Sequence, residues 1–118
     1  MTENTHDLAL KIANALSDKK GKDIIIIDVK NKTVIADYFV IASAKSTTAV
    51  KALADNVEEK LSKEESREPL RRDGFAGSTW IATDYGSVIV HVFHDEAREY
   101  YRLERLWMDG ENCERIED

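Results

Sequence analysis

Residues 80–93 place a tryptophan, an aspartate and a histidine within one short run of strand-forming residues. A histidine can act as a general base, bind a metal or make a neutral hydrogen bond near pH 7. Trp80, Asp84 and His91 therefore allow four interpretations: an active site, a metal site, a core cluster or a surface that binds another molecule. The choice depends on which side chains share a face of the sheet.

Metal and nucleophile chemistry have little support. A zinc site needs about four Cys, His or carboxylate ligands, whereas His91 and His94 are three residues apart and would point to opposite faces of a strand. Ser43 and Ser46 have no histidine near them in sequence, and a helix cap accounts for Ser46. Asp37 lacks the second carboxylate that metal-dependent phosphoryl transfer would prefer two residues on. Without a phosphate-binding glycine motif either, we predict no enzyme, no metal and no cofactor.

The strands that carry these residues are predicted at 80–84 and 87–93, with Gly86 in the turn. A loop at Tyr85-Gly86 would place Trp80 opposite His91, and a loop at Gly86-Ser87 would place Trp80 opposite Phe93. Because side chains alternate along a strand, both registers put the same residues on one face, namely Trp80, Ala82, Asp84, Ile89, His91 and Phe93. A three-residue loop would instead place Trp80 beside Val90 and Val92. The other face holds Ile81, Val88, Val90 and Val92, enough for a core. This argues against a core cluster around Trp80, but a core cluster and a binding surface both stay open.

The remaining periodicities predict three helices and two further strands. Leu8, Ile12 and Leu16 recur at helical spacing, with Asn4 or Thr5 as the start cap and Gly21 at the end. Strands are predicted at 23–29 and 36–43, both apolar on both faces. A second helix starts at Ser46, with its buried stripe at Val50, Leu53, Val57 and Leu61. Residues 69–78 indicate a loop or a short edge strand.

A third helix is predicted from Asp95, its cap, to Trp107. In it Tyr100, Leu103 and Trp107 fall at helical spacing and are expected to face the sheet, whereas Tyr101 cannot fully join them. The order α-β-β-α-(β)-β-β-α predicts an α+β (or α/β) domain, a mixed sheet with helices packed on it.

Composition restricts the class of protein. The 118 residues suffice for one domain, the single cysteine permits no internal disulfide, and no apolar run approaches the ~20 residues of a membrane span, so we expect a cytoplasmic protein. Residues 84–118 hold ten acidic and four basic side chains, which accounts for the whole net charge of −6. This acidity disfavours nucleic acid and would attract a basic protein partner. The alternative is that it only aids solubility, and composition alone favours that interpretation. Residues 109–118 have little to bury and are predicted to be a disordered acidic tail.

Three segments together resemble the Iojap family, also called ribosomal silencing factor S. They are ADYFVIAS, WIATDYGSVIVHVF and REYYRLERLW, and the resemblance runs from about Asp23 to Trp107. Ala44 departs from the pattern, since the family usually has glycine there, and the His or Gln that usually follows soon after Ser46 is missing.

The resemblance implies a single domain over residues 1–108, with a topology related to nucleotidyltransferases but without their catalytic carboxylates. It also implies that the protein binds the fourteenth protein of the large ribosomal subunit at the intersubunit face. The small subunit is then blocked sterically, translation is repressed, and the free protein is a homodimer. The residues expected to contact the partner are Trp80, Asp84, His91, Arg98, Tyr101, Glu104, Leu106 and Trp107.

Two alternatives remain beside this anti-association factor. One is a small nucleotidyl- or phosphoryl-transfer enzyme, suggested only by the fold relationship. The other is a homodimeric stress protein that has no role at the ribosome.

Overall fold

The computed structural model describes residues 5–75 and 77–116 of the chain. The helices are α1 (Thr5–Asp18), α2 (Thr47–Glu65), α3 (Asp95–Tyr101) and α4 (Leu103–Trp107). The strands are β1 (Lys22–Asp28), β2 (Tyr38–Ala44), β3 (Arg71–Phe75), β4 (Trp80–Asp84), β5 (Val88–His94) and β6 (Cys113–Arg115). Asn4, one of the two residues expected to cap the first helix, lies outside the described residues.

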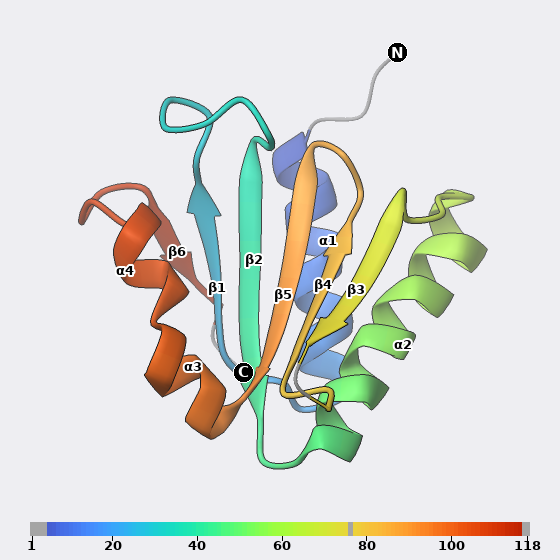
Figure 1. Ribbon diagram of the computed structural model, residues 1–118. Helices are drawn as coiled ribbons and strands as arrows, with labels where there is room; N and C mark the ends of the chain where they lie inside the picture. The colour runs from blue at the N-terminus through green and yellow to red at the C-terminus, as the bar shows by residue number, and fades with distance from the viewer. Residues whose placement is uncertain (1–4, 76, 117–118) are drawn as a thin grey trace.

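The strands form one mixed sheet in the order β3-β4-β5-β2-β1-β6. The central pair β2 and β5 is parallel, and every other neighbouring pair is antiparallel. Helices α1 and α2 cover one face of the sheet, while α3 and α4 lie on the other face at the side of β1 and β6 (Figure 1). The predicted mixed sheet with packed helices is confirmed.

The larger core lies between the sheet and the α1/α2 layer. The predicted stripe of α2 is fully buried there, as are Ile81, Val88, Val90 and Val92 from the hairpin. Strands β1 and β2 are buried on both faces, as expected from their consecutive apolar residues. Because this core is complete without them, the side chains on the opposite face of β4 and β5 are not needed to fill it.

A smaller core lies on the other face of the sheet, beneath α3 and α4. Its buried members include Ile25, Ile27, Phe39, Ile41 and Phe93, and Leu103 and Trp107 pack on them from α4. Figure 1 shows that these two short helices reach over only part of the face, so that β3, β4 and β5 remain uncovered in front. This half-covered arrangement leaves an open sheet surface.

The predicted third helix is interrupted at Arg102. This residue has φ 47° and ψ 49°, a left-handed conformation that separates α3 from α4. In α3, before the break, Tyr100 is 81% exposed, whereas Tyr101 contacts the rings of Trp80 and Phe93. The prediction that Tyr100 faces the sheet is therefore wrong, while Leu103 and Trp107 do pack on it.

Two further predictions about element ends need correction. The N-cap of α3 is His94, whose Nδ1 accepts from the Glu96 N–H, and Asp95 is the first helical residue. The acidic tail is not wholly disordered, because Cys113–Arg115 pair with β1 as an edge strand. Asn112, which immediately precedes this strand, donates to the carbonyls of Asp28 and Trp107 and so holds the chain beside β1. Residues 117 and 118 of the predicted tail lie outside the described residues.

Candidate interface on the open face of the sheet

The hairpin β4–β5 adopts the second of the two registers considered above. Trp80 pairs with Phe93, Ala82 with His91 and Asp84 with Ile89, and Tyr85 donates to the carbonyl of Val88 across the turn. Gly86 has φ 86°, which a residue with a side chain rarely adopts. The prediction that these six side chains share one face of the sheet is confirmed.

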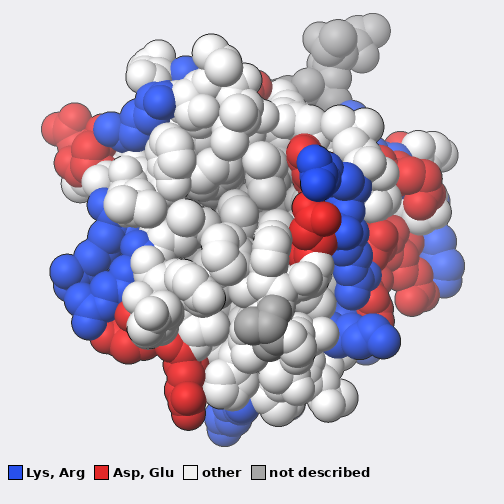
Figure 2. Space-filling model, in the orientation of Figure 1, with Lys and Arg blue, Asp and Glu red and all other residues white. Residues whose placement is uncertain are grey.

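A shallow hollow of about 320 Å³ occupies this face where α3 and α4 do not reach. We call its apolar floor, made by Phe75, Trp80, Ala82, Ile89 and His91, the open face. Its charged rim is Arg71, Asp73 and Asp84. Figure 2 shows the same surface as a broad uncharged area with charged side chains on both sides.

Trp80 is held in place by an aromatic cluster. Its ring stacks on Phe93 at 4.9 Å and also contacts the rings of Phe75 and Tyr101 at 5.0 and 5.1 Å. The indole Nε1–H donates to Nδ1 of His91 at 3.1 Å. The indole is half-buried. The ring contacts and the hydrogen bond fix its orientation.

His91 is a neutral acceptor that orients the tryptophan. Accepting at Nδ1 places its proton on Nε2, which is buried without a hydrogen-bond partner among the described residues. The imidazole lies edge-on to Phe39, with 5.1 Å between the ring centroids. Burial lowers the pKa of His91 to about 4. His91 was expected to contact the partner, but its accepting nitrogen already binds Trp80 within the chain.

The other expected contact residues fall into two groups. Tyr101 is 44% exposed and contacts Trp80 at the border of the open face, Leu106 is 74% exposed on α4, and Trp107 is half-buried against Phe39. Arg98 and Glu104 pair with each other at 3.1 Å, with Arg98 only 8% exposed, so their charges are already engaged. Asp84 remains at the rim, where its Oδ1 accepts from the Gly86 N–H at 2.7 Å.

The whole chain from residue 2 to residue 118 matches the family model described as "Ribosomal silencing factor during starvation". The chain belongs to this family of ribosomal silencing factors. It is 35% identical over 111 residues to "Ribosomal silencing factor RsfS" of Halalkalibacterium halodurans, and the match covers 94% of each chain.

Two further proteins are similar to this chain over most of its length. A crystal structure of a Chromobacterium violaceum protein superposes with a TM-score of 0.84 at 35% identity, covering 89% of this chain and 87% of that one. A mouse protein named "Mitochondrial assembly of ribosomal large subunit protein 1" is 32% identical over 98 residues, which are 81% of this chain and 43% of the mouse protein. The resemblance stated from the three sequence segments is thereby confirmed.

Strand β3 adds residues to the silencing factor's open face that sequence reasoning did not anticipate. Phe75 and Asp73 face the same way as Trp80 and Ala82, their cross-strand partners. For residues 69–78 the sequence allows a loop or a short edge strand, and the edge strand is the alternative that forms, at Arg71–Phe75. The side chains that this strand adds to the face were not predicted, because charged residues and Gly74 weaken the strand pattern.

No helix in the described ranges is both long and apolar enough to cross a membrane. Among the same residues, the structure groups no three His, Cys, Asp or Glu side chains in a way that could hold a metal ion.

The buried His91 predicts a pH dependence of this silencing factor's stability. The folded-state pKa of about 4 lies below the ordinary value of 6.5, so between these values the unfolded chain binds the extra proton. The free energy of unfolding should fall as the pH drops from 6.5 toward 4, by at most about 1.4 kcal/mol per pH unit from this group. Urea unfolding at pH 7 and pH 5 measures the change.

His91→Gln supplies the comparison, because an amide can still accept from Trp80 but does not titrate. The stability difference between the two pH values should shrink in His91→Gln and persist in His6→Gln. An unchanged difference in His91→Gln would contradict the assignment of a neutral, buried His91.

Proposed function

We propose that the open face is the surface by which this protein binds the large ribosomal subunit, through the subunit's fourteenth protein at the intersubunit face. Bound there, it blocks association with the small subunit sterically and so represses translation. The observation that carries the proposal is the half-buried, oriented Trp80 on a sheet face that the chain's own helices leave uncovered.

The composition of this surface supports an interface. Phe75 is 43% exposed within this surface, and Tyr101, 44% exposed, contacts Trp80 at its border. Contiguous apolar patches with a polar rim mark binding sites on soluble proteins, and aromatic residues are enriched in their centres. The hydrogen bond from Trp80 to His91 fixes the indole before binding, which reduces the entropy lost on association.

The choice of partner rests on the family and on charge. The family is one of ribosomal silencing factors, and the name of the mouse relative refers to the ribosomal large subunit. The net charge of −6, concentrated after residue 83, favours a basic protein over RNA as the direct contact. We also propose a cytoplasmic location and a homodimer in the free state, as the resemblance implies.

Steric exclusion is a sufficient mechanism for a body of this size. The domain measures 39 × 34 × 27 Å. A rigid body at least that thick on the intersubunit face holds the two subunits apart without any chemical step, and we therefore propose that the protein is not an enzyme. Metal-dependent nucleotide transfer that Asp37→Ala abolishes would instead favour the enzyme of the same fold.

Cosedimentation with isolated large subunits, followed by light scattering during subunit joining, tests the proposal. Ala82→Glu places a charged side chain in the centre of the open face, and Ala52→Glu makes the same change on the exposed side of α2. We expect wild type and Ala52→Glu to sediment with large subunits and slow joining, and Ala82→Glu to do neither. Binding that leaves joining unaffected would contradict the steric mechanism.

The charged rim predicts a dependence of binding on salt. Exposed charge pairs chiefly accelerate association and are screened as ionic strength rises. We expect the association rate with large subunits to fall with added salt, and to fall less steeply in Asp84→Asn, whose side-chain oxygen can still accept from Gly86. Glu64→Gln on α2 is the matched control and should keep the salt dependence of wild type. An association rate that does not change with salt concentration would count against contacts at the rim.

A further inference from the structure

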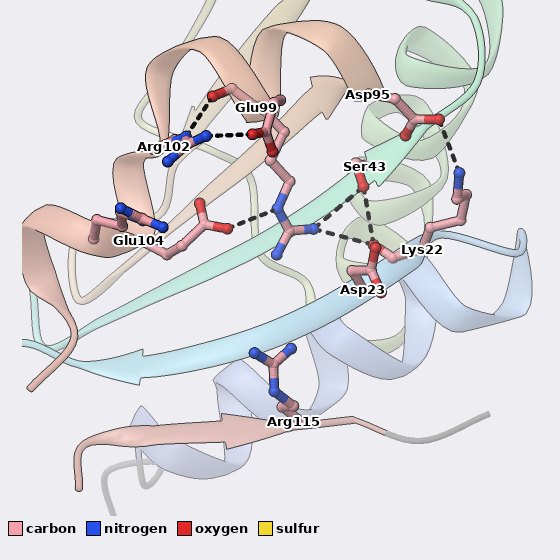
Figure 3. Close-up of a pocket in the computed structure, with 10 residues that line it drawn as sticks. Lys22, Asp23, Ser43, Asp95, Glu99, Arg102, Glu104 and Arg115 are labelled. Atoms are coloured by element: carbon pink, nitrogen blue, oxygen red, sulfur yellow. Dashed lines mark hydrogen bonds and ion pairs between the residues drawn. The ribbon is translucent and has the colours of Figure 1, made fainter. Parts of the chain in front are cut away.

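A second cavity, of about 570 Å³, shares no lining residue with the open face. Figure 3 shows the residues that line it. It is bounded by the start of β1, the end of β2, helices α3 and α4, and β6. Its lining is almost entirely charged: Lys22, Asp23, Ser43, Asp95, Arg98, Glu99, Arg102, Glu104, Arg105 and Arg115. We call this cavity the arginine pocket. The proposed interface uses none of the cations that line it.

Arg98 is the buried element of the arginine pocket, only 8% exposed. Its Nε donates to Glu104, and its Nη1 donates to the Lys22 carbonyl and to Ser43 Oγ. Its Nη2 has no hydrogen-bond partner in the described part of the chain and is not fully buried. The structural contacts of Arg98 therefore leave one guanidinium nitrogen with access to the cavity that Arg98 lines.

The charges that line the pocket do not all cancel. Lys22 pairs with Asp95, Arg98 with Glu104, and Arg102 with Glu99. The side chains of Arg105 and Arg115 form no ion pair or hydrogen bond within residues 5–75 and 77–116, and neither does Asp23. Arg115 lies on β6, across the cavity from Ser43 and Glu104 (Figure 3). Guanidinium groups from α3, α4 and β6 thus line one cavity in a protein whose net charge is −6.

We propose that the arginine pocket binds a small phosphate-bearing anion of the size of a pyrophosphate group or a nucleoside diphosphate. The guanidinium groups of Arg105 and Arg115 can present parallel N–H donors that match the oxygens of a phosphate. Nη2 of Arg98 adds one donor from a side chain that its other contacts already hold in place. The cavity volume lies within the range of roughly 300–1,000 Å³ that small-molecule sites occupy. The lining holds five cations and four carboxylates, so it lacks the extended basic surface that a long polyanion such as RNA needs.

Calorimetric titration with sodium pyrophosphate at low ionic strength tests this inference. Arg105→Gln/Arg115→Gln removes the two unpaired cations, both exposed, without touching the buried Arg98. Lys19→Gln/Lys51→Gln removes the same charge from exposed positions outside the pocket. We expect one site per chain in wild type and in the lysine variant, and binding at least about tenfold weaker in the arginine variant. Circular dichroism of all three proteins verifies folding.

Further titrations identify the ligand. Equal affinities for adenosine diphosphate and pyrophosphate would show that the phosphates alone are recognised. Tighter binding of adenosine diphosphate than of pyrophosphate would indicate a nucleotide site. Absence of saturable binding by both compounds would overturn the proposal, as would equal weakening in the arginine and lysine variants. Tighter binding of a short single-stranded RNA than of either compound would also overturn it.

Discussion

Arg98→Met is expected to lower the free energy of unfolding by about 3 kcal/mol or more, because removal of one partner strands the other charge of a buried ion pair. The Glu104 carboxylate would lose its only ion-pair partner in the described structure, while its Oε1 already has no hydrogen-bond partner there. The Lys22 carbonyl and Ser43 Oγ would lose a charged donor as well. Urea unfolding followed by circular dichroism measures the loss.

Arg102→Met is the matched control for this substitution. Arg102 is more exposed and pairs with Glu99 within one turn of α3, a type of surface pair that contributes about 0–1 kcal/mol. We also expect Arg98→Met/Glu104→Gln to be more stable than Arg98→Met alone, since the stranded charge is gone. Equal losses in Arg98→Met and Arg102→Met would contradict a structural role for the buried pair.

Trp80→Ala is expected to weaken binding to large ribosomal subunits by at least about 30-fold, the loss typical of a truncated hot-spot tryptophan. Some folding stability should be lost too, because the indole also packs on Phe93 and Tyr101. The two effects are separable by measuring the dissociation constant at a temperature where circular dichroism shows the variant to be folded.

Two aromatic substitutions serve as controls for Trp80→Ala. Trp80→Phe retains a ring but removes the donor to His91, so it should bind with an intermediate affinity. Tyr100→Ala removes a ring that is 81% exposed on α3 and points away from the sheet, so it should bind like wild type. A folded Trp80→Ala protein that binds with unchanged affinity would show that the indole is not an anchor.

Sequence periodicity predicted the helices and strands that form the larger core, because their apolar residues recur at the spacing of one buried face. The common face of Trp80 and His91 followed from the two-residue alternation of strands, which holds in either register of the hairpin. The break at Arg102 was not predictable, because arginine carries no preference for the left-handed conformation that it adopts there. Strand β6 was missed because it is three residues long and gains its stability from pairing with β1.

The uncovered state of the candidate site could not be predicted for a related reason. Alternation tells which side chains share a face but not whether a helix covers that face. Phe93 and Ile89 lie on one face of the same strand, yet Phe93 is fully buried beside α3 and Ile89 is partly exposed. The difference follows from the length and direction of two short helices, which depend on tertiary contacts.

Site-specific photo-crosslinking from the open face tests most directly whether that face is the ribosomal interface. A photoreactive amino acid at Ile89, within the hollow, is compared with the same group at Ala52 on the exposed side of α2, each irradiated with isolated large subunits. We predict that position 89 crosslinks to the fourteenth protein of the large subunit and that position 52 does not. Crosslinks to that protein from position 52 alone, or from neither position while the protein still sediments with the subunit, would contradict the account.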